Sequence, residues 1–190
     1  MTISVNSAAG AKGNEANFVT DSNGNVTGLE APNGSIVRTF AQVDGSAVAV
    51  ATQSTSEVIL GQVQIPAGLI GANGVLRYTF KFSHSSGSNS KTIRVRFGTA
   101  GTTSDSLVLD GATTSNIAGV FWGEIANRNS ASSQICGPNN SLSVGGTTVA
   151  LRTASIDTTS ATYVSFGALN TSGADTFTLE SYFVEVLSRS

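Results

Sequence analysis

The residues of this chain that are able to do acid–base or nucleophilic chemistry are few and scattered. His84 is the single histidine, and it sits in the Ser/Gly/Asn-rich stretch 83–90. A serine hydrolase needs a histidine base that is oriented by a carboxylate, and this stretch contains no acid. The chain also lacks a G-x-S-x-G motif. We therefore predict that His84 is an exposed loop residue and not a catalytic base.

Residues 21–25, Asp-Ser-Asn-Gly-Asn, carry oxygen side chains at the first, third and fifth positions of a calcium-binding loop. The rest of that motif is missing, because Val26 stands where a glycine is required and Pro32 where the bidentate glutamate should be. A hairpin turn held by side-chain-to-backbone hydrogen bonds accounts for the same residues. We predict no metal site here.

Asp105 and Asp110 flank the short apolar segment 107–109. Glycoside hydrolysis needs two carboxyl groups held about 5–9.5 Å apart, one of them in an apolar pocket. Both aspartates lie beside turn signals, so we interpret them as turn residues. The single cysteine, Cys136, excludes an internal disulfide and a cysteine-based zinc site. We expect no cofactor and no enzymatic activity, such as that of a polysaccharide depolymerase.

Basic residues gather in one part of the chain. If segments 75–83 and 91–98 pair as neighbouring strands, four basic residues share one face of a sheet. Like charges placed opposite each other destabilise a strand pair, so acids such as Glu180 and Glu185, or an anionic partner, would have to offset them. Two interpretations stay open: a solvated face with scattered counter-ions, or a contact for another subunit or a polyanionic glycan. The residues of this candidate face are Arg77, Lys81, Arg94 and Arg96, with Lys91 in the same stretch.

The single tryptophan lies among apolar neighbours in Phe121-Trp122-Gly123. A lone tryptophan in such a setting is usually a core residue, and we predict that Trp122 is buried. An exposed Trp122 would instead favour a sugar-stacking platform. Tyr163 is the second candidate for such a platform, and the polar loop 127–140 would supply hydrogen-bonding groups.

Composition limits the classes of function. Charged residues make up 12% of the 190-residue chain, against about 25% in average domains, so the surface is built mainly from Ser, Thr, Asn and Gly. The formal net charge of −2 predicts no general attraction to nucleic acid. No apolar stretch approaches the ~20 residues of a membrane span, and the N-terminus shows no secretory signal pattern. We expect a protein made in a cytoplasm, with no membrane insertion.

Alternating apolar and polar residues indicate strands from Ser35 onward. The clearest case is segment 75–83, where Leu76, Tyr78 and Phe80 alternate with polar residues. Strand segments recur with turn signals at intervals of about 8–12 residues, and no segment keeps a 3.6-residue period. The sequence predicts an all-β protein, an antiparallel, jelly-roll-like β-sandwich of about nine or ten strands.

The first 34 residues are rich in Asn, Gly and Ala and poor in large apolar side chains. Segment 18–29 predicts a small hairpin around an Asn-Gly turn, with too little apolar surface to fold alone. We interpret residues 1–34 as an extended N-terminal arm or small hairpin module and residues 35–190 as the sandwich domain. A frayed terminus is the alternative.

The last strand, residues 177–187, becomes apolar on both faces. A strand that is covered on both sides lies centrally in a sheet or against another subunit. The candidate residues of a subunit seam are Phe177, Leu179, Phe183, Val184 and Val186.

Two segments resemble a part of tailed-bacteriophage structural proteins, which are described as fibre, head-fibre, decoration or tail proteins. They are residues 64–77, Gln-Ile-Pro-Ala-Gly-Leu-Ile-Gly-Ala-Asn-Gly-Val-Leu-Arg, and residues 91–98, Lys-Thr-Ile-Arg-Val-Arg-Phe-Gly. The hairpin 18–29 is similar to the short modules that precede such domains. The resemblance implies a jelly-roll-like sandwich in the virion, assembled as a homotrimer and attached to capsid or tail proteins through residues 1–34.

Two functions are consistent with these observations. The first is a non-enzymatic virion structural protein, a trimeric fibre or capsid-decoration protein. The alternative is a receptor-binding module of a phage tail that recognises host surface glycan. Both can hold in one protein, because a fibre is able to carry a receptor site.

Overall fold

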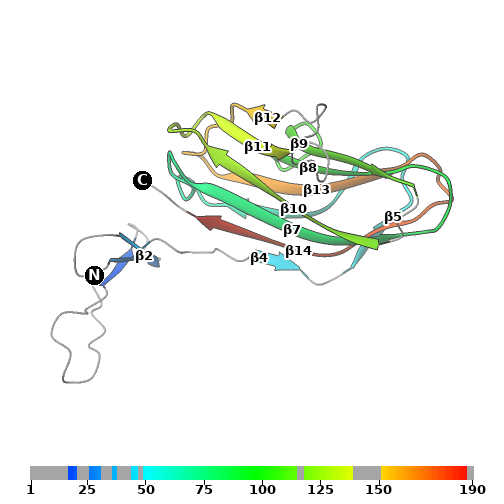
Figure 1. Cartoon of the computed structure of the whole chain (residues 1–190), viewed down its shortest axis with the longest axis horizontal. Coiled ribbons are helices and arrows are strands. Elements are labelled where there is room, and N and C mark those ends of the chain that lie inside the picture. Colours follow the sequence, from blue (N-terminus) through cyan, green and yellow to red (C-terminus); the bar gives the residue numbers. More distant parts are fainter. Residues whose placement is uncertain are drawn as a thin grey trace, which may run out of the picture.

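A computed structural model shows an all-β protein in which the strands pair antiparallel throughout the part described. These residues contain no helix, and hence none that could cross a lipid bilayer. The predicted antiparallel β-sandwich is confirmed (Figure 1). The structure describes residues 17–20, 26–30, 36–37, 44–46, 49–114, 118–138 and 151–187.

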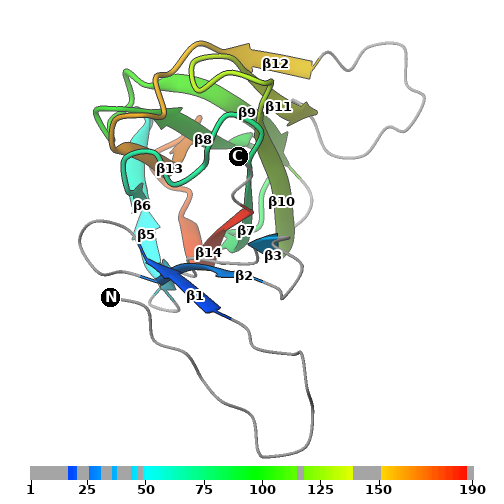
Figure 2. The ribbon, with the colours of Figure 1, turned by 90° about the vertical axis from the view of Figure 1, so that its left-hand side faces the viewer.

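Two sheets pack face to face to form the sandwich (Figures 1 and 2). The larger, seven-stranded sheet has the order β12-β11-β10-β7-β14-β4, and β5 also pairs with β14. Its strands are β4 (Asp44–Ser46), β5 (Val50–Thr52), β7 (Val75–His84), β10 (Ala118–Asn127), β11 (Gln134–Pro138), β12 (Leu151–Ala154) and β14 (Phe177–Leu187). The four-stranded sheet has the order β6-β13-β8-β9. Its strands are β6 (Val58–Ile65), β8 (Lys91–Gly98), β9 (Ser106–Thr113) and β13 (Thr162–Asn170).

A separate three-stranded sheet lies near the N-terminus. It consists of β1 (Asn17–Thr20), β2 (Val26–Glu30) and β3 (Ile36–Val37) in that order. Phe18 lies opposite Leu29, as the predicted hairpin requires. The candidate calcium loop, residues 21–25, and the greater part of the predicted arm lie outside the described residues.

Side chains alternate along each strand between the two faces of its sheet, and those on the inward face form the core. From β7 it takes Tyr78 and Phe80, both at most 2% exposed. Both rings meet Phe166 of β13, with ring centroids 6.2 Å and 5.4 Å away respectively. Complete burial of one such ring stabilises the fold by about 1.5–3 kcal/mol, so this aromatic layer is a major part of the driving force.

Strands β7 and β8 do not pair, so the pairing of segments 75–83 and 91–98 on which the shared basic face depended does not occur. β7 lies between β10 and β14 in one sheet, whereas β8 lies between β13 and β9 in the other. The connection, residues 85–90, therefore crosses from sheet to sheet. Each strand has one strongly apolar face, and both faces enter the same core when the strands oppose each other across the sandwich.

Two glycines on the inward side of β10 make room for aromatic rings of β7. A Cβ atom at Gly119 would lie 2.8 Å from the Phe82 ring, and one at Gly123 would lie 2.3 Å from Tyr78 Oη. Tyr78 is 2% exposed and held on all sides by the core. The strand thus provides space that the large residues of its neighbour fill.

We predict that Gly123→Ala destabilises the fold by about 1–3 kcal/mol, because the new methyl group overpacks the core against Tyr78. The matched control is Gly137→Ala on β11, where the nearest atom to a new Cβ is 3.5 Å away. This control should change stability by less than ~1 kcal/mol. Urea unfolding of both variants measures the difference, and equal losses would contradict the packing argument.

Candidate functional site

The outer face of the seven-stranded sheet carries exposed aromatic residues in its middle. Trp122 on β10 lies opposite Thr79 on β7, and Thr79 lies opposite Phe183 on β14. These three outward residues form one row across three neighbouring strands. The side chain of Trp122 is 68% exposed and that of Phe183 is 39% exposed. The row is an exposed aromatic platform that can receive an apolar surface or the face of a sugar ring.

Charged residues border this row on both sides. On one side Arg77 lies opposite Glu124 and Glu185, and Arg77 Nε is 2.7 Å from Glu124 Oε1. On the other side Lys81 lies opposite Val120 and Ser181. We call this surface the Trp122 face. It consists of Arg77, Thr79, Lys81, Val120, Trp122, Glu124, Ser181, Phe183 and Glu185.

Trp122 is not in the core, and the prediction of a buried tryptophan is wrong. Along β10, Phe121 and Ile125 point inward, so Trp122 points outward together with Glu124. The strand is apolar on both sides, which concealed this choice in the sequence. The charge at position 124 was the one local signal of the outward side.

The predicted subunit seam on β14 divides between the two faces of the strand. Phe183 points outward and joins the Trp122 face. The other four residues are at most 2% exposed and belong to the chain's own core, so they are not available to a second subunit as predicted. These four are Phe177, Leu179, Val184 and Val186.

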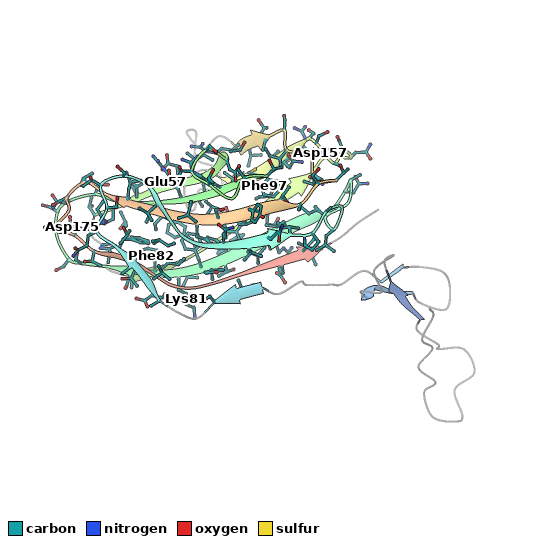
Figure 3. All side chains as sticks on the ribbon, turned by 180° about the vertical axis from the view of Figure 1, so that it is seen from behind. Glu57, Lys81, Phe82, Phe97, Asp157 and Asp175 are labelled. Carbon is teal, nitrogen blue, oxygen red and sulfur yellow. The ribbon has the colours of Figure 1, made fainter. Side chains whose placement is uncertain are left out.

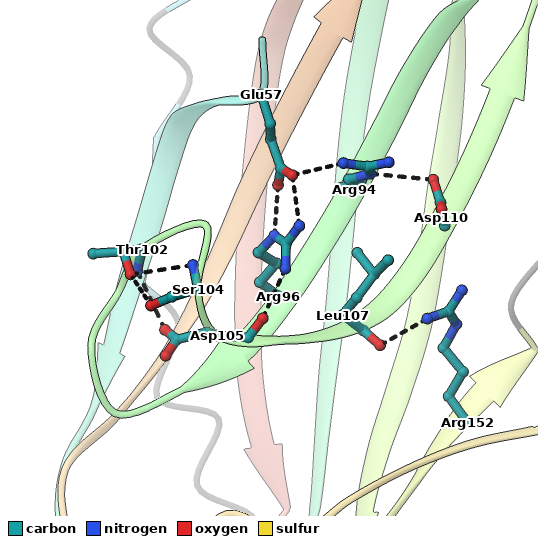
Figure 4. A network of polar contacts seen from close by, with 9 residues as sticks. All are labelled: Glu57, Arg94, Arg96, Thr102, Ser104, Asp105, Leu107, Asp110 and Arg152. Carbon is teal, nitrogen blue, oxygen red and sulfur yellow. Dashed lines mark hydrogen bonds and ion pairs between the residues drawn. The ribbon is translucent and has the colours of Figure 1, made fainter.

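The outer face of the four-stranded sheet carries a network of ion pairs (Figure 4). Arg96 binds the Glu57 carboxylate through two nitrogens, Nε to Oε1 and Nη2 to Oε2, each at 2.6 Å. Arg94 Nη1 lies 2.8 Å from Glu57 Oε2, and its Nε lies 3.3 Å from Asp110 Oδ1. Gly167 beneath them leaves space for the carboxylate, since a Cβ there would be 2.9 Å from Glu57 Oε1.

Glu57 is ionised in this setting. Burial of the carboxyl group opposes ionisation, but the hydrogen bonds and the positive charges of Arg96 and Arg94 outweigh it and lower the pKa of Glu57. The side chain is 8% exposed. The network therefore neutralises itself and leaves little unpaired charge for an outside anion.

The four residues of the predicted basic face do not share a face. Arg77 and Lys81 lie on the outer side of the seven-stranded sheet, and Arg94 and Arg96 on that of the four-stranded sheet. Figure 3 shows Glu57 and Lys81 on opposite sides of the sandwich, with Phe82 between them. The acids that pair with the arginines are Glu57, Asp110 and Glu124, whereas Glu180 accepts a hydrogen bond from Ser83.

Asp105 is a turn residue, as predicted. Its carboxylate accepts hydrogen bonds from the backbone N–H groups of Ala100, Gly101 and Thr102 at 2.7–3.2 Å, which closes the loop after β8. Asp110 is not a turn residue, because it lies within β9 and pairs with Arg94. The two carboxylates have separate structural partners.

Tyr163 and Trp122 lie on opposite sides of the sandwich and do not form one platform. Tyr163 pairs with Gln64 and Gly98 on the outer side of the four-stranded sheet, and the loop residue Gly101 packs against its ring. The predicted polar loop 127–140 is not one loop, because Asn127 ends β10 and residues 134–138 form β11. The Asn127 amide nitrogen already donates to Gly71 and Thr158. Residues 139–150 lie outside the described part.

His84 is buried, so the prediction of an exposed loop residue is wrong. It is the last residue of β7 and continues the inward set, with its ring stacked on Phe82. Its Nδ1 lies 2.8 Å from the Ser85 carbonyl oxygen, and the Ser85 hydroxyl donates to Asp175 rather than to the ring. This arrangement is not a serine–histidine–acid triad.

The described residues contain neither a reactive thiol nor a cluster of metal ligands. Burial raises the pKa of the Cys136 thiol to about 11, which keeps the sulfur protonated and unreactive. No three His, Cys, Asp or Glu side chains come together there as ligands for a metal ion.

We predict that Glu57→Gln costs about 2–3 kcal/mol of stability, because it leaves two partly buried arginines without their anion. The matched control is Glu124→Gln, which breaks the exposed pair with Arg77 and should cost about 0–1 kcal/mol. The lowered pKa of Glu57 means that its contribution is present above the pKa of the unfolded chain and is lost as the pH falls through the folded value. Urea unfolding at several pH values should therefore show a Glu57→Gln defect that shrinks in acid. A defect that is unchanged in acid would contradict the ion-pair account.

No family model and no curated protein matches this chain. Solved structures of similar outline belong to viral capsid proteins and plant lectins. The VP2 subviral particle of infectious bursal disease virus aligns over 81% of this chain and 35% of its own, at 9% identity and a TM-score of 0.36. Lectin II from Ulex europaeus aligns over 79% of this chain and 94% of its own, at 15% identity and a TM-score of 0.34. Sacbrood virus of honeybee aligns over 78% of this chain and 69% of its own, at 13% identity and a TM-score of 0.30.

This chain spans about a third of the length of the VP2 chain that it resembles.

Proposed function

We propose that this chain is a non-enzymatic structural protein of a tailed-phage virion, a homotrimeric fibre or capsid-decoration protein. The observation that carries the proposal is the Trp122 face, where an exposed tryptophan and phenylalanine lie on central strands of the seven-stranded sheet. Aromatic residues surrounded by polar ones are typical of the centre of a protein interface. The resemblance of residues 64–77 and 91–98 to tailed-phage structural proteins supports the virion setting.

The occupant that fits the Trp122 face best is a second copy of the chain. The two bases, Arg77 and Lys81, and the two acids, Glu124 and Glu185, balance within the face. A copy turned about a symmetry axis can then place opposite charges against each other, whereas a strongly anionic partner gains nothing overall. The short strands β4 and β5 pair with β14 and cover its free edge, so association uses the face of this sheet rather than that edge.

Attachment to capsid or tail proteins is assigned in this proposal to residues 1–34. Such a segment gains order when it binds, at a cost of about 1–2 kcal/mol for each residue that becomes fixed. A chain that lacks it should still form the sandwich, because the paired strands of both sheets lie beyond residue 34. In this proposal residues 1–34 attach the protein to the particle, and the sandwich domains of several copies bind one another.

We predict a molar mass in solution of three times the 19.3 kDa chain by light scattering behind size exclusion. The double variant Trp122→Ser, Phe183→Ser should be a folded monomer, because it removes both aromatic residues of the interface. The matched control is Val58→Ser, which removes an apolar side chain of similar exposure to Phe183 from the other sheet and should leave the trimer intact. A wild-type monomer would overturn the proposal of self-assembly.

The exposed Trp122 also favours the alternative, a receptor-binding module for host surface glycan. A tryptophan ring on a flat surface stacks well on a sugar ring. In this alternative, the neighbouring Thr79 hydroxyl and Glu124 carboxylate are the groups that hydrogen-bond to it.

The alternative predicts that the purified protein binds a host glycan and blocks phage adsorption, and that Trp122→Ala abolishes both without a change in molar mass. Tyr163→Phe, on the opposite side of the molecule, is the control that should keep binding. Inert glycan arrays together with unimpaired adsorption would exclude this alternative and leave the assembly role untouched.

A further inference from the structure

An amine, a carboxamide and a carboxylate are buried at one end of the sandwich. Lys91 is 0% exposed, Asn170 is 1% exposed and Asp175 is 6% exposed. Lys91 begins β8 on the inward side, in the same set as Ile93. Figure 3 shows Asp175 at this end of the molecule, far from Asp157 at the other.

The polar atoms of this end are poorly satisfied. Among the described residues, five buried side-chain atoms have no hydrogen-bond partner, and four of them are His84 Nε2, Lys91 Nζ, Asn170 Oδ1 and Asp175 Oδ2. Lys91 Nζ forms an ion pair with Asp175 Oδ1, but their distance of 3.4 Å is long for a charge-assisted hydrogen bond. A buried ammonium group with so little compensation is costly for the fold.

The opposite end of the sandwich shows that this chain is able to satisfy buried polar groups. There Gln134 donates to Asn127 Oδ1 at 2.8 Å and accepts from the backbone N–H of Ile156 at 2.8 Å. Asn127 in turn donates to Thr158 Oγ1 at 2.9 Å and to the Gly71 carbonyl oxygen at 2.6 Å. The deficit around Lys91 is therefore local to one end and not a general feature of the molecule.

The backbone places Lys91 and Asn170 side by side on neighbouring strands. Lys91 and Asn170 are directly opposite each other in the antiparallel pair of β8 and β13, and both side chains lie on the inner side. Directly opposite residues have Cβ atoms about 4.5–5.5 Å apart. The Asn170 Nδ2 group donates to the carbonyl oxygens of Thr52, at 3.2 Å, and Asp175, at 3.1 Å, which fixes the orientation of the carboxamide.

We propose that Lys91 and Asn170 form an intramolecular amide bond in the folded protein, with Asp175 as the base. The Asp175 carboxylate takes a proton from the Lys91 ammonium group, and the free electron pair of Nζ attacks Asn170 Cγ. The Cγ–Nδ2 bond of the tetrahedral intermediate then breaks, and Nδ2 leaves as ammonia after it receives a proton from the attacking nitrogen. The ammonia takes the proton from Asp175 and departs as ammonium. One ammonium group and one carboxamide thus become one secondary amide and one ammonium ion.

Asp175 is suited to the role of base rather than that of the acceptor. Hydrogen bonding from the Asn89 side chain, followed by the Lys91 charge, lowers the pKa of Asp175 in spite of its burial, so the group is an ionised carboxylate and a weak base. Its role as proton acceptor rests on its position, because Asp175 Oδ1 lies 3.4 Å from Lys91 Nζ. If Asp175 itself formed the amide, no second carboxyl group would remain beside Nζ to assist. The reaction with Asn170 also removes the buried positive charge, which has an ion pair with Asp175 at 3.4 Å but no hydrogen bond to Nζ.

Such a bond would be a covalent cross-link within a chain that cannot form an internal disulfide. Cys136 is the one cysteine of the chain, so a disulfide within a single copy is impossible. The new amide would link β8 to β13 and close the whole segment between them, including β9 to β12. A cross-link over a long segment limits the freedom of the unfolded chain most.

The test is the mass of the intact, full-length protein, followed by a tryptic digest. We expect a mass below that of the sequence by one ammonia, and a branched peptide that joins residues 82–94 to residues 153–189, because trypsin does not cleave after a modified Lys91. The branched peptide separates this reaction from ammonia loss at Asn-Gly sequences. The sequence mass with unbranched peptides alone would overturn the proposal, whether or not any variant folds.

Variants identify the roles of the three residues. Lys91→Met and Asn170→Ala should show no ammonia loss, and Asp175→Ala should show a strongly reduced yield. Lys81→Met, on an exposed lysine, is the matched control and should keep the complete shift. Loss of one water, with a branch between Lys91 and Asp175, would overturn the assignment of Asn170 as the acceptor.

Discussion

The aromatic layer between the two sheets is the interaction on which the rest of this structure depends. Tyr78 and Phe80 of β7 meet Phe166 of β13 across the sandwich, and the glycines of β10 give the rings of β7 their space. Because side chains alternate along a strand, the side that enters this layer decides the direction of every other residue. The outward position of Trp122 and the inward position of Lys91 are both consequences of it.

The two outer faces of the sandwich differ in how they treat charge. On the four-stranded sheet, Glu57 binds Arg94 and Arg96 together, and the face is electrostatically complete within one chain. On the seven-stranded sheet, an aromatic row is exposed between balanced charges. In a chain with 12% charged residues, such a surface is the natural place for a further contact, and this contrast underlies the proposed assembly.

The two ends of the sandwich differ in the same way. At one end, hydrogen bonds link the side chains of Asn127, Gln134 and Thr158 and satisfy their polar atoms. At the other end Lys91 and Asn170 have polar atoms without partners, next to a carboxylate. Natural proteins retain such deficits where a ligand, a water molecule or a reaction completes the site. This contrast is the reason to look for chemistry at the end of β8 rather than on an exposed surface.

The sequence by itself determined the fold class and most strands of the sandwich, because a period of two and regular turn signals are local properties. It missed β11, which lies in the polar segment that was predicted to be a loop. The inward direction of Lys91 and His84 was also encoded in the sequence, because each lies two residues from an inward apolar residue of its own strand. The sequence did not determine that β7 and β8 belong to different sheets, because strand pairing is a long-range choice among similar segments. For the same reason only the tertiary structure decided the direction of Trp122, the partner of Arg96 and the meeting of Lys91 with Asn170. Hydrogen-bonded pairs such as Asn127–Gly71 and Asn170–Thr52 lie 56 and 118 positions apart in the sequence, and they meet only once both sheets have formed.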